Sequence, residues 1–242
     1  DVHLVTAKTE PRLAVVICSV GRPDCLRELV PSLVAQSRPA DRVIFALTQP
    51  SDIGFDPGPL FPQTTRVEVI FSDKGLPRQR NAALDVLSGD CDMVVFYDDD
   101  FVPSKHALAG VLRGFAEWPD VNGMTGELIA DGINGPGFDA AEAAAMVADF
   151  DSRNPDGGAL RVIREGLEGL YGCNMAYRVS AIGNARFDPE LPLYGWQEDI
   201  DFAARIPGGR IKTQAFAGVH RGAKSGRETS GRRLGYSQLA NT

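Results

Sequence analysis

The sequence predicts a single-domain α/β fold in which a mixed, mainly parallel sheet lies between helices. Two observations carry this prediction. Short apolar runs rich in β-branched residues alternate with amphipathic segments of helical period along the first half of the chain, which is typical of a sheet covered on both faces. The 242 residues are 43% hydrophobic and 24% charged, and this composition excludes disordered, collagen-like and membrane-bundle chains.

Four apolar runs in the first half are predicted to be buried strands. Their apolar side chains follow one another with little polar interruption, as expected where both faces of a strand are covered. The runs are residues 13–18 (LAVVIC), 42–47 (RVIFAL), 66–71 (RVEVIF) and 93–97 (MVVFY).

Amphipathic helices are predicted between these strands. Pro23 suits the first turn of a helix that continues to Gln36 with apolar residues at helical spacing. A second helix follows Pro77, and a third begins at Ser104, whose hydroxyl suits a helix N-cap. Strands and helices therefore alternate in the order that builds an α/β sheet.

The second half has longer loops between its elements. An alternating stretch at 124–130 (MTGELIA) predicts a strand, and Asp139 with Glu142 forms a capping-box pattern before an Ala-rich helix that reaches about Phe150. A strand at 171–178, a short helix at 198–205 and a last strand at 210–216 complete the prediction. Since no repeat and no clear linker divides the chain, we expect one domain.

Charge and cysteine content narrow the class of partner. The four cysteines form no C-x-x-C pair and no run approaches the ~20 apolar residues of a spanning helix, so we expect a cytoplasmic protein. The net charge of −7 disfavours nucleic acid as a partner. Residues 221–233, in contrast, hold five basic residues against one acidic residue. This stretch suits phosphate groups or the anionic inner face of a membrane, or is a solvated tail.

Three consecutive carboxylates, Asp98, Asp99 and Asp100, directly follow the apolar run MVVFY. The carboxyl end of a buried strand is where open α/β sheets bind ligands, and neighbouring carboxylates call for an offsetting cation. In an extended chain Asp98 and Asp100 project to one side and Asp99 to the other. The triplet therefore predicts a metal or nucleotide site, with a solvated acidic turn as the alternative.

A second acidic pair, Glu198 and Asp199, stands at the start of the short predicted helix. A helix N-terminus favours the ionised carboxylate that a general base requires. Tyr194 and Trp196 precede the pair and can form a flat apolar platform for a sugar ring. Ordinary helix capping is the alternative interpretation of the two carboxylates.

Basic residues gather at the start of the helix that follows Pro77. Lys74, Gly75, Arg78 and Arg80 combine a turn with cations, which suits a diphosphate or a nucleobase edge. Residues two apart on a helix point about 200° apart, so at most one of the two arginines should reach a ligand. His220, after the last predicted strand, is either a structural histidine or a ligand.

These segments together resemble the inverting family 2 glycosyltransferases of GT-A (nucleotide-diphospho-sugar transferase) fold, from about residue 13 to 220. The resemblance rests on VVICSVGRP, KGLPRQRNAAL, the Asp triplet in the place of the family's Asp-x-Asp motif, YGCNMAYR, and the Glu-Asp pair of GWQEDIDFAARI. It implies a sugar moved from a nucleotide-diphosphate sugar to a hydroxyl of a saccharide or lipid-linked acceptor, in bacterial polysaccharide or glycoconjugate synthesis.

The resemblance also implies a role for each site residue. Asp199 would be the catalytic base, with Glu198 as its rival, and Asp100 and His220 would bind Mn²⁺ or Mg²⁺. The nucleotide would contact Ser19, Val20, Gly21, Arg22, Lys74, Gly75, Arg78, Arg80, Asp98 and Asp99. The acceptor or sugar would contact Tyr194, Trp196, Gly172 and Asn174.

The domain boundaries combine the extent of this resemblance with the basic, Gly- and Ser-rich composition of the last residues. Residues 1–220 would form the GT-A domain, with a nucleotide-binding half at about 13–118 and an acceptor-binding half at about 119–220. Residues 221–242 would be a basic, flexible tail that closes over the diphosphate or contacts a membrane.

Two departures and two alternatives accompany this interpretation. The strand at 42–47 is followed by TQPSD rather than by an immediate acidic residue, which leaves the nucleobase open. The long insertion at 126–158 cannot be interpreted by analogy with the family, and we expect it to shape the acceptor pocket. A sugar-nucleotidylyltransferase shares the sheet order, but residues 19–23 (SVGRP) lack its Gly-rich, Lys-containing loop. A non-catalytic nucleotide- or carbohydrate-binding module would not need both acidic motifs.

Overall fold

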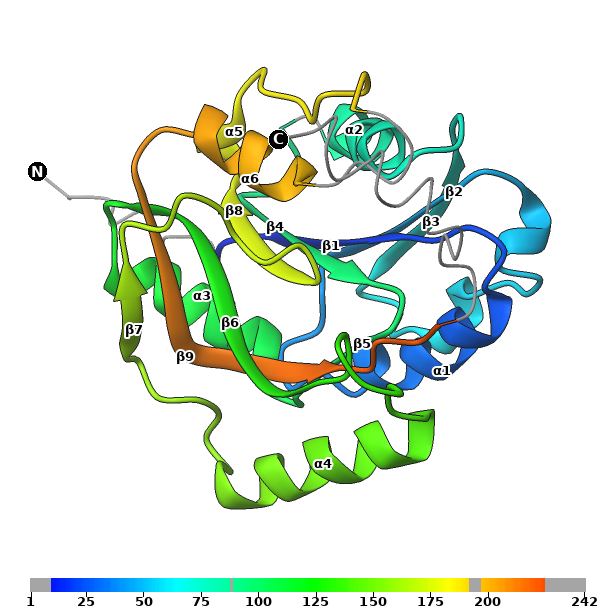
Figure 1. Cartoon of the computed structure of the whole chain (residues 1–242), viewed down its shortest axis with the longest axis horizontal. Helices are drawn as coiled ribbons and strands as arrows, with labels where there is room; N and C mark the ends of the chain where they lie inside the picture. The colour runs from blue at the N-terminus through cyan, green and yellow to red at the C-terminus, as the bar shows by residue number, and fades with distance from the viewer. Residues whose placement is uncertain (1–9, 88, 192–196, 225–242) are drawn as a thin grey trace, which may run out of the picture.

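The computed structural model describes residues 10–87, 89–191 and 197–224. Within them, nine strands form one sheet in the order β3-β2-β1-β4-β8-β6-β9-β5, with β7 paired to β9 (Figure 1). The strands are β1 (Leu13–Cys18), β2 (Arg42–Leu47), β3 (Arg66–Phe71), β4 (Met93–Asp98), β5 (Phe101–Pro103), β6 (Val121–Asp131), β7 (Val162–Glu165), β8 (Asn174–Arg178) and β9 (Gly209–His220). The predicted mixed, mainly parallel α/β sheet is confirmed.

Helices cover both faces of this sheet (Figure 1). They are α1 (Pro23–Val34), α2 (Leu76–Leu87), α3 (Ala107–Glu117), α4 (Ala140–Arg153), α5 (Val179–Ile182) and α6 (Glu198–Arg205), with two 3-10 turns at Pro50–Asp52 and Gly58–Leu60. Helices α1 and α3 lie on one face, and α2, α5 and α6 lie on the other. None of the helices in the described ranges combines the length and the apolar character that crossing a bilayer requires.

The side chains of β1 show how one strand serves both layers. Leu13, Val15 and Ile17 join the core beneath α1 and α3, while Ala14 and Val16 join the core beneath α2 and α6. Successive side chains of a strand point to opposite faces of the sheet. A strand that is covered on both faces must therefore be apolar at every position. This explains the uninterrupted apolar runs of the sequence.

The directions of the strands determine where the site lies. β4 runs parallel to β1, and β8 is antiparallel to both β4 and β6, while β9 is parallel to β6. Strands β1, β4, β6 and β9 therefore share one direction, and their carboxyl ends lie along the same edge of the sheet, the edge that runs across the strands. Their last residues include Asp98, Asp131 and His220, and the fold gathers these side chains at that edge.

Several predicted boundaries are confirmed and others are wrong. α6 begins at Glu198, and the Asp139–Glu142 capping box precedes α4. The third helix begins at Ala107 instead of Ser104, because residues 101–103 form β5 against the end of β9 and the chain must turn first. The strand predicted from Tyr171 begins at Asn174. Strands β5 and β7 and helix α5 were not predicted.

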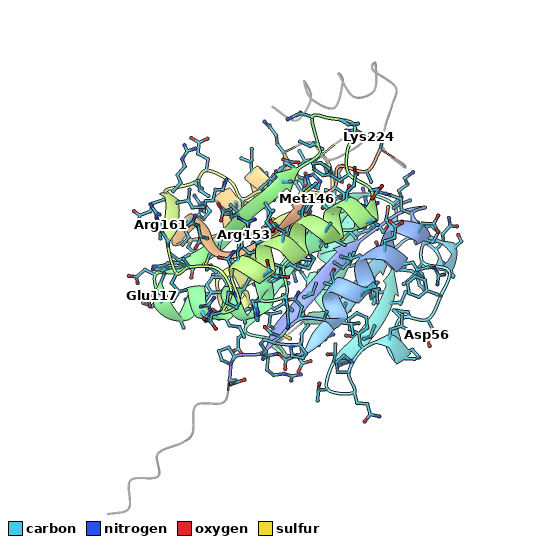
Figure 2. All side chains as sticks on the ribbon, turned by 90° about the horizontal axis from the view of Figure 1, so that it is seen from below. Asp56, Glu117, Met146, Arg153, Arg161 and Lys224 are labelled. Atoms are coloured by element: carbon cyan, nitrogen blue, oxygen red, sulfur yellow. The ribbon has the colours of Figure 1, made fainter. Side chains whose placement is uncertain are left out.

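Helix α4 forms an additional outer layer. Seen from below (Figure 2), it lies beside α1, with Met146 and Arg153 along its length. Ala143 and Val147 pack against Val219 of β9. The insertion that carries α4 therefore covers the β9 end of the sheet.

Helix α3 approaches β9 so closely that one glycine is required. A Cβ atom on Gly110 would lie 1.8 Å from the carbonyl oxygen of Ala215. We expect Gly110→Ala to lower the free energy of unfolding by about 1–3 kcal/mol, because helix and strand must separate to admit the methyl group. Urea denaturation measures this change.

Gly135 provides the matched control, because a Cβ there meets no atom within 4 Å. Gly135→Ala should change the free energy of unfolding by less than about 0.5 kcal/mol. Equal stability of the two variants would show that α3 does not pack on β9 as described.

Candidate active site

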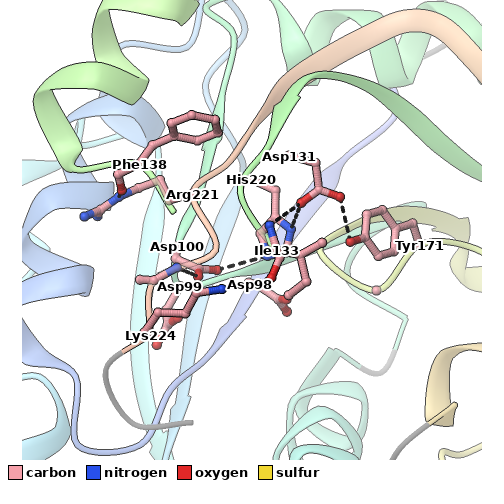
Figure 3. A network of polar contacts seen from close by, with 12 residues as sticks. Asp98, Asp99, Asp100, Asp131, Ile133, Phe138, Tyr171, His220, Arg221 and Lys224 are labelled. Carbon is pink, nitrogen blue, oxygen red and sulfur yellow. Dashed lines mark hydrogen bonds and ion pairs between the residues drawn. The ribbon is translucent and has the colours of Figure 1, made fainter. Parts of the chain in front are cut away.

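The edge at which β4 and β9 end brings together three groups able to bind a metal ion. Asp98, Asp100 and His220 each offer a ligand atom, and these atoms lie within 4.8 Å of one another. Figure 3 shows them between the end of β4 and the last residues of β9. The two residues predicted to bind metal, Asp100 and His220, are thus adjacent, and Asp98 lies with them.

Asp100 is buried, and three polar groups lie close to its carboxylate. Its carboxylate lies 3.5 Å from Nε2 of His220 and 3.4 Å from the Arg22 guanidinium, and it accepts a hydrogen bond from the backbone N–H of Ala223. Burial alone would raise the pKa of Asp100, but His220, Arg22 and the Ala223 N–H lower it to about 2. Asp100 is therefore ionised at neutral pH, as a metal ligand must be.

Asp99 points away from this cluster, as the alternation of an extended chain predicted. It accepts a hydrogen bond from the Ser19 hydroxyl at 2.5 Å and pairs with Arg22 at 2.8 Å. Burial raises the pKa of Asp99 to about 7 in spite of these two partners. Asp99, Ser19 and Arg22 thus join the loop after β1 to the end of β4, and nucleotide contact by them stays a prediction.

The donor set fits a divalent cation. Two carboxylate oxygens and one imidazole nitrogen are ligands that Mn²⁺ accepts, and carboxylates also suit Mg²⁺. Asp98 keeps 32% of its side chain exposed, whereas the side chains of Asp100 and His220 are buried. The cluster therefore has one open side, formed by Asp98, from which a ligand can approach.

Arg80 connects Asp98 of this cluster to the start of α6, and its predicted contact with a nucleotide stays a prediction. Its guanidinium is buried and contacts Glu198 at 2.6 Å, Asp98 at 3.5 Å and the carbonyl oxygen of Gly172 at 3.1 Å. Burial raises the pKa of Glu198 to about 7, although the Arg80 charge opposes the shift. Arg80 joins α2, the end of β4 and the start of α6.

Asp199 lies next to this group and remains accessible. Its carboxylate accepts hydrogen bonds from the backbone N–H groups of Gly172 at 3.0 Å and Ile200 at 2.9 Å. It is half-buried, whereas Glu198 is buried. Of the two acidic residues at the start of α6, Asp199 is the one that an incoming molecule can reach.

The loop after β2 contains an acidic residue, Asp52, for which the sequence predicted no role. Asp52 is fully buried and accepts hydrogen bonds from the N–H groups of Gly21, Thr48 and Gln49 and from the Thr48 hydroxyl. Burial opposes ionisation, but the bonds from Thr48, Gly21 and Gln49 lower the pKa of Asp52. Asp52 fixes the loop that bears Gly21, and its oxygens are occupied by the backbone.

The other predicted site residues lie at different depths. Lys74 and Arg78 are exposed, and Arg78 is 3.4 Å from the carbonyl oxygen of Pro189. Asn174 is buried, and its side-chain amide has no hydrogen-bond partner in the described part of the chain. Gly75 is partly exposed with φ of 141°, and Val20 is also partly exposed. Tyr194 and Trp196 lie outside the described residues.

The sequence did not single out Asp131 and Tyr171. Asp131 ends β6, accepts a hydrogen bond from the Tyr171 hydroxyl at 2.9 Å and lies 2.9 Å from Nδ1 of His220 (Figure 3). The only signal was an acidic residue just after the alternating stretch 124–130. Such a residue is common at a strand end, so the signal was too weak to use.

The first residues of the predicted tail are packed against the domain. Arg221 is only 8% exposed and pairs with Glu28 of α1 at 2.6 Å. The Lys224 ammonium donates to the carbonyl oxygen of Ile133. These cations are engaged by the protein itself, and the rest of the predicted tail, 225–242, lies outside the described residues.

Comparison with known protein families gives a match over most of the chain. The profile of the family described as Glycosyl transferase family 2 matches residues 14–184. None of the curated proteins matches the sequence.

Solved structures show the same fold. S. aureus TarS 1-349 in complex with UDP-GlcNAc is 16% identical with a TM-score of 0.63, over 91% of this chain and 61% of that one. Mannosyltransferase PcManGT from Pyrobaculum calidifontis, in complex with GDP-Man and Mn²⁺, is 14% identical with a TM-score of 0.61, over 90% and 59%. The GT-A fold is confirmed, and the chain spans about three fifths of the length of these two proteins.

The Arg80–Glu198 ion pair gives a test of the buried network. Arg80→Met leaves the Glu198 carboxylate buried without its cation, which should lower the free energy of unfolding by about 3–5 kcal/mol. Adding Glu198→Gln should recover part of this loss, because the neutral amide has a smaller desolvation cost. Urea denaturation of both single variants and the double variant measures the coupling.

Arg78→Met is the control for this cycle, since Arg78 lies two residues away on the exposed side of α2. It should change the free energy of unfolding by less than about 0.5 kcal/mol. Strictly additive losses for Arg80→Met and Glu198→Gln would contradict the described pair.

Proposed function

Because the chain belongs to glycosyl transferase family 2, whose profile matches residues 14–184, we propose that it is a metal-dependent, inverting hexosyltransferase. It would move a sugar from a nucleotide-sugar donor to an acceptor hydroxyl in a single displacement. Residues 13–118 would serve the nucleotide and residues 119–220 the acceptor.

One observation carries the proposal: Gly172 joins the candidate metal ligands to the candidate base. Its N–H donates to Asp199 and its carbonyl oxygen accepts from Arg80, which also contacts Asp98. Single displacement requires a base on one side of the sugar and a departing diphosphate on the other. Gly172 connects Asp199, the candidate base, to Asp98, a candidate ligand of the metal that would stabilise the departing diphosphate. Both functions are therefore supported within one site.

The geometry supports Asp199 over Glu198 as the base. A base must come within hydrogen-bond reach of the proton that it removes. Glu198 is buried against Arg80, whereas Asp199 is half-buried. Two backbone N–H groups hold the Asp199 carboxylate in place. The orientation of this carboxylate is therefore fixed by the main chain and not by other, more flexible side chains.

Asp98, Asp100 and His220 would hold Mn²⁺ or Mg²⁺ together with the donor diphosphate. A divalent ion bound there supplies positive charge where negative charge develops on the leaving group. Of the structural neighbours, one was solved with GDP-Man and Mn²⁺ and the other with UDP-GlcNAc. These two donors differ in nucleobase and in sugar. Because the carboxylate of Asp52 already accepts hydrogen bonds from backbone groups, it does not select a nucleobase, and the proposal is compatible with either guanine or uracil.

The wider setting belongs to the same proposal. We infer a saccharide or lipid-linked acceptor and a role in bacterial polysaccharide or glycoconjugate synthesis at the cytoplasmic side of the membrane. Because Arg221 and Lys224 are engaged within the domain, the later basic residues of the stretch, Arg227, Arg232 and Arg233, would contact anionic lipid. Binding of the protein to anionic vesicles in the absence of nucleotide tests the membrane contact.

The decisive variant for the function is Asp199→Asn. We expect it to lower turnover of the donor ~100-fold or more, as for the loss of a general base. Binding of the nucleoside diphosphate should stay nearly unchanged, because Asp199 would contact the acceptor. Steady-state kinetics with Mn²⁺ and calorimetric titration of the nucleoside diphosphate measure the two effects.

Glu198→Gln is the matched control, since it neutralises the neighbouring carboxylate. It should affect stability more than turnover of the folded enzyme. Normal turnover in Asp199→Asn together with its loss in Glu198→Gln would assign the base to Glu198 instead.

A further inference from the structure

We propose that Asp131 positions His220 for metal binding, holding the proton of the ring on Nδ1 so that Nε2 faces Asp100. The proposal rests on the metal-dependent function proposed above and adds a residue that contacts neither metal nor substrate. Figure 3 shows the contacts among Asp131, Tyr171 and His220.

The backbone at His220 is fixed on both sides. Its carbonyl oxygen accepts a hydrogen bond from the N–H of Gly132, and the next N–H, of Arg221, donates to the carbonyl oxygen of Asp100. His220 therefore lies between the end of β6 and the loop that carries Asp100. These bonds fix the Cα position, but they leave rotation of the imidazole ring to the side-chain contacts.

The Asp131 contact determines how the ring presents its nitrogens. Asp131 Oδ1 lies 2.9 Å from Nδ1 of His220, and an ionised carboxylate can only accept a hydrogen bond. Nδ1 must then be the donor, and in the neutral ring the lone pair belongs to Nε2. That nitrogen is 3.5 Å from Asp100 Oδ1 and belongs to the group of potential ligands.

Asp131 is itself held in place. Its Oδ1 also accepts from the backbone N–H of Ile133 at 3.0 Å, and its Oδ2 accepts from the Tyr171 hydroxyl at 2.9 Å. The Tyr171 ring packs edge-on against the His220 ring, with 5.9 Å between centroids. Tyr171 thus contacts both the carboxylate and the imidazole, and limits the rotation of each.

This arrangement is the one that tunes histidine ligands in metalloproteins. A carboxylate on the second ring nitrogen fixes the tautomer and orientation of the ring and increases its basicity, and loss of such a partner typically costs ~10–100-fold in metal affinity. Asp131 touches the nitrogen that faces away from Asp100, so its effect should pass through His220. A purely structural Asp131 would leave metal affinity unchanged in the folded variant.

The test measures Mn²⁺ affinity of the full chain by electron paramagnetic resonance of the free ion. Asp131→Ala should weaken Mn²⁺ binding ~10–100-fold. Asp131→Asn should recover most of this loss, because the amide oxygen still accepts from Nδ1. Asp149→Ala, which removes an exposed carboxylate on α4, controls for the change in net charge, and circular dichroism confirms that each variant is folded.

A second background shows whether the effect passes through the histidine. In His220→Ala, adding Asp131→Ala should cause no further loss of Mn²⁺ affinity. An equal loss in both backgrounds would overturn the proposal, because Asp131 would then act directly on the ion. Unchanged affinity in folded Asp131→Ala would overturn it too, while leaving the proposed function intact.

The remaining outcome separates the two proposals. If the wild-type chain binds no Mn²⁺, metal dependence fails and the positioning role fails with it. The ring proton is measured independently in the metal-free protein by ¹⁵N NMR, where only three histidines contribute signals. At a pH where the His220 ring is neutral, the proton should reside on Nδ1 in wild type and in Asp131→Asn, and a proton on Nε2 in wild type would contradict the proposal.

Discussion

Three carboxylates in succession, residues 98–100, begin at the last residue of a strand that is buried on both faces, and positively charged or polar groups have to offset their mutual repulsion. The offsetting groups come from three different parts of the chain. Arg80 of α2 contacts the first carboxylate, Arg22 from the loop after β1 pairs with the second, and His220 of β9 lies beside the third. The arrangement of the whole edge depends on these contacts, since burial would otherwise favour protonated, neutral carboxyl groups.

The same contacts connect the two halves of the chain. Arg80 reaches from α2 to Glu198 at the start of α6, and the Gly172 backbone lies between Arg80 and Asp199. On the other side, Asp131 extends the cluster from His220 to Tyr171. The proposed base and the proposed metal ligands therefore share one supporting network of contacts.

Local pattern was sufficient for most of the sheet and for part of the site. Uninterrupted apolar runs predicted the strands that are covered on both faces. The resemblance to the family, rather than local pattern, placed Asp100 and His220 together, and the two side chains are adjacent. Pairing over long distances was beyond local pattern. β5 has three residues and exists because it pairs with β9. The ion pair between Arg80 and Glu198 was not predicted, because the two residues are far apart in the sequence. Asp131 was missed for the same reason: its partner, His220, is distant in the sequence.

The most direct measurement of the central claim is the position of Mn²⁺ in crystals grown with a nucleoside diphosphate, located by anomalous scattering at the manganese edge. We expect one ion bound by carboxylate oxygen of Asp100 and by Nε2 of His220, with Nδ1 still donating to Asp131 and Asp199 free of the ion. An ion bound away from Asp100 and His220, or a His220 ring turned away from Asp131, would contradict this account of the site.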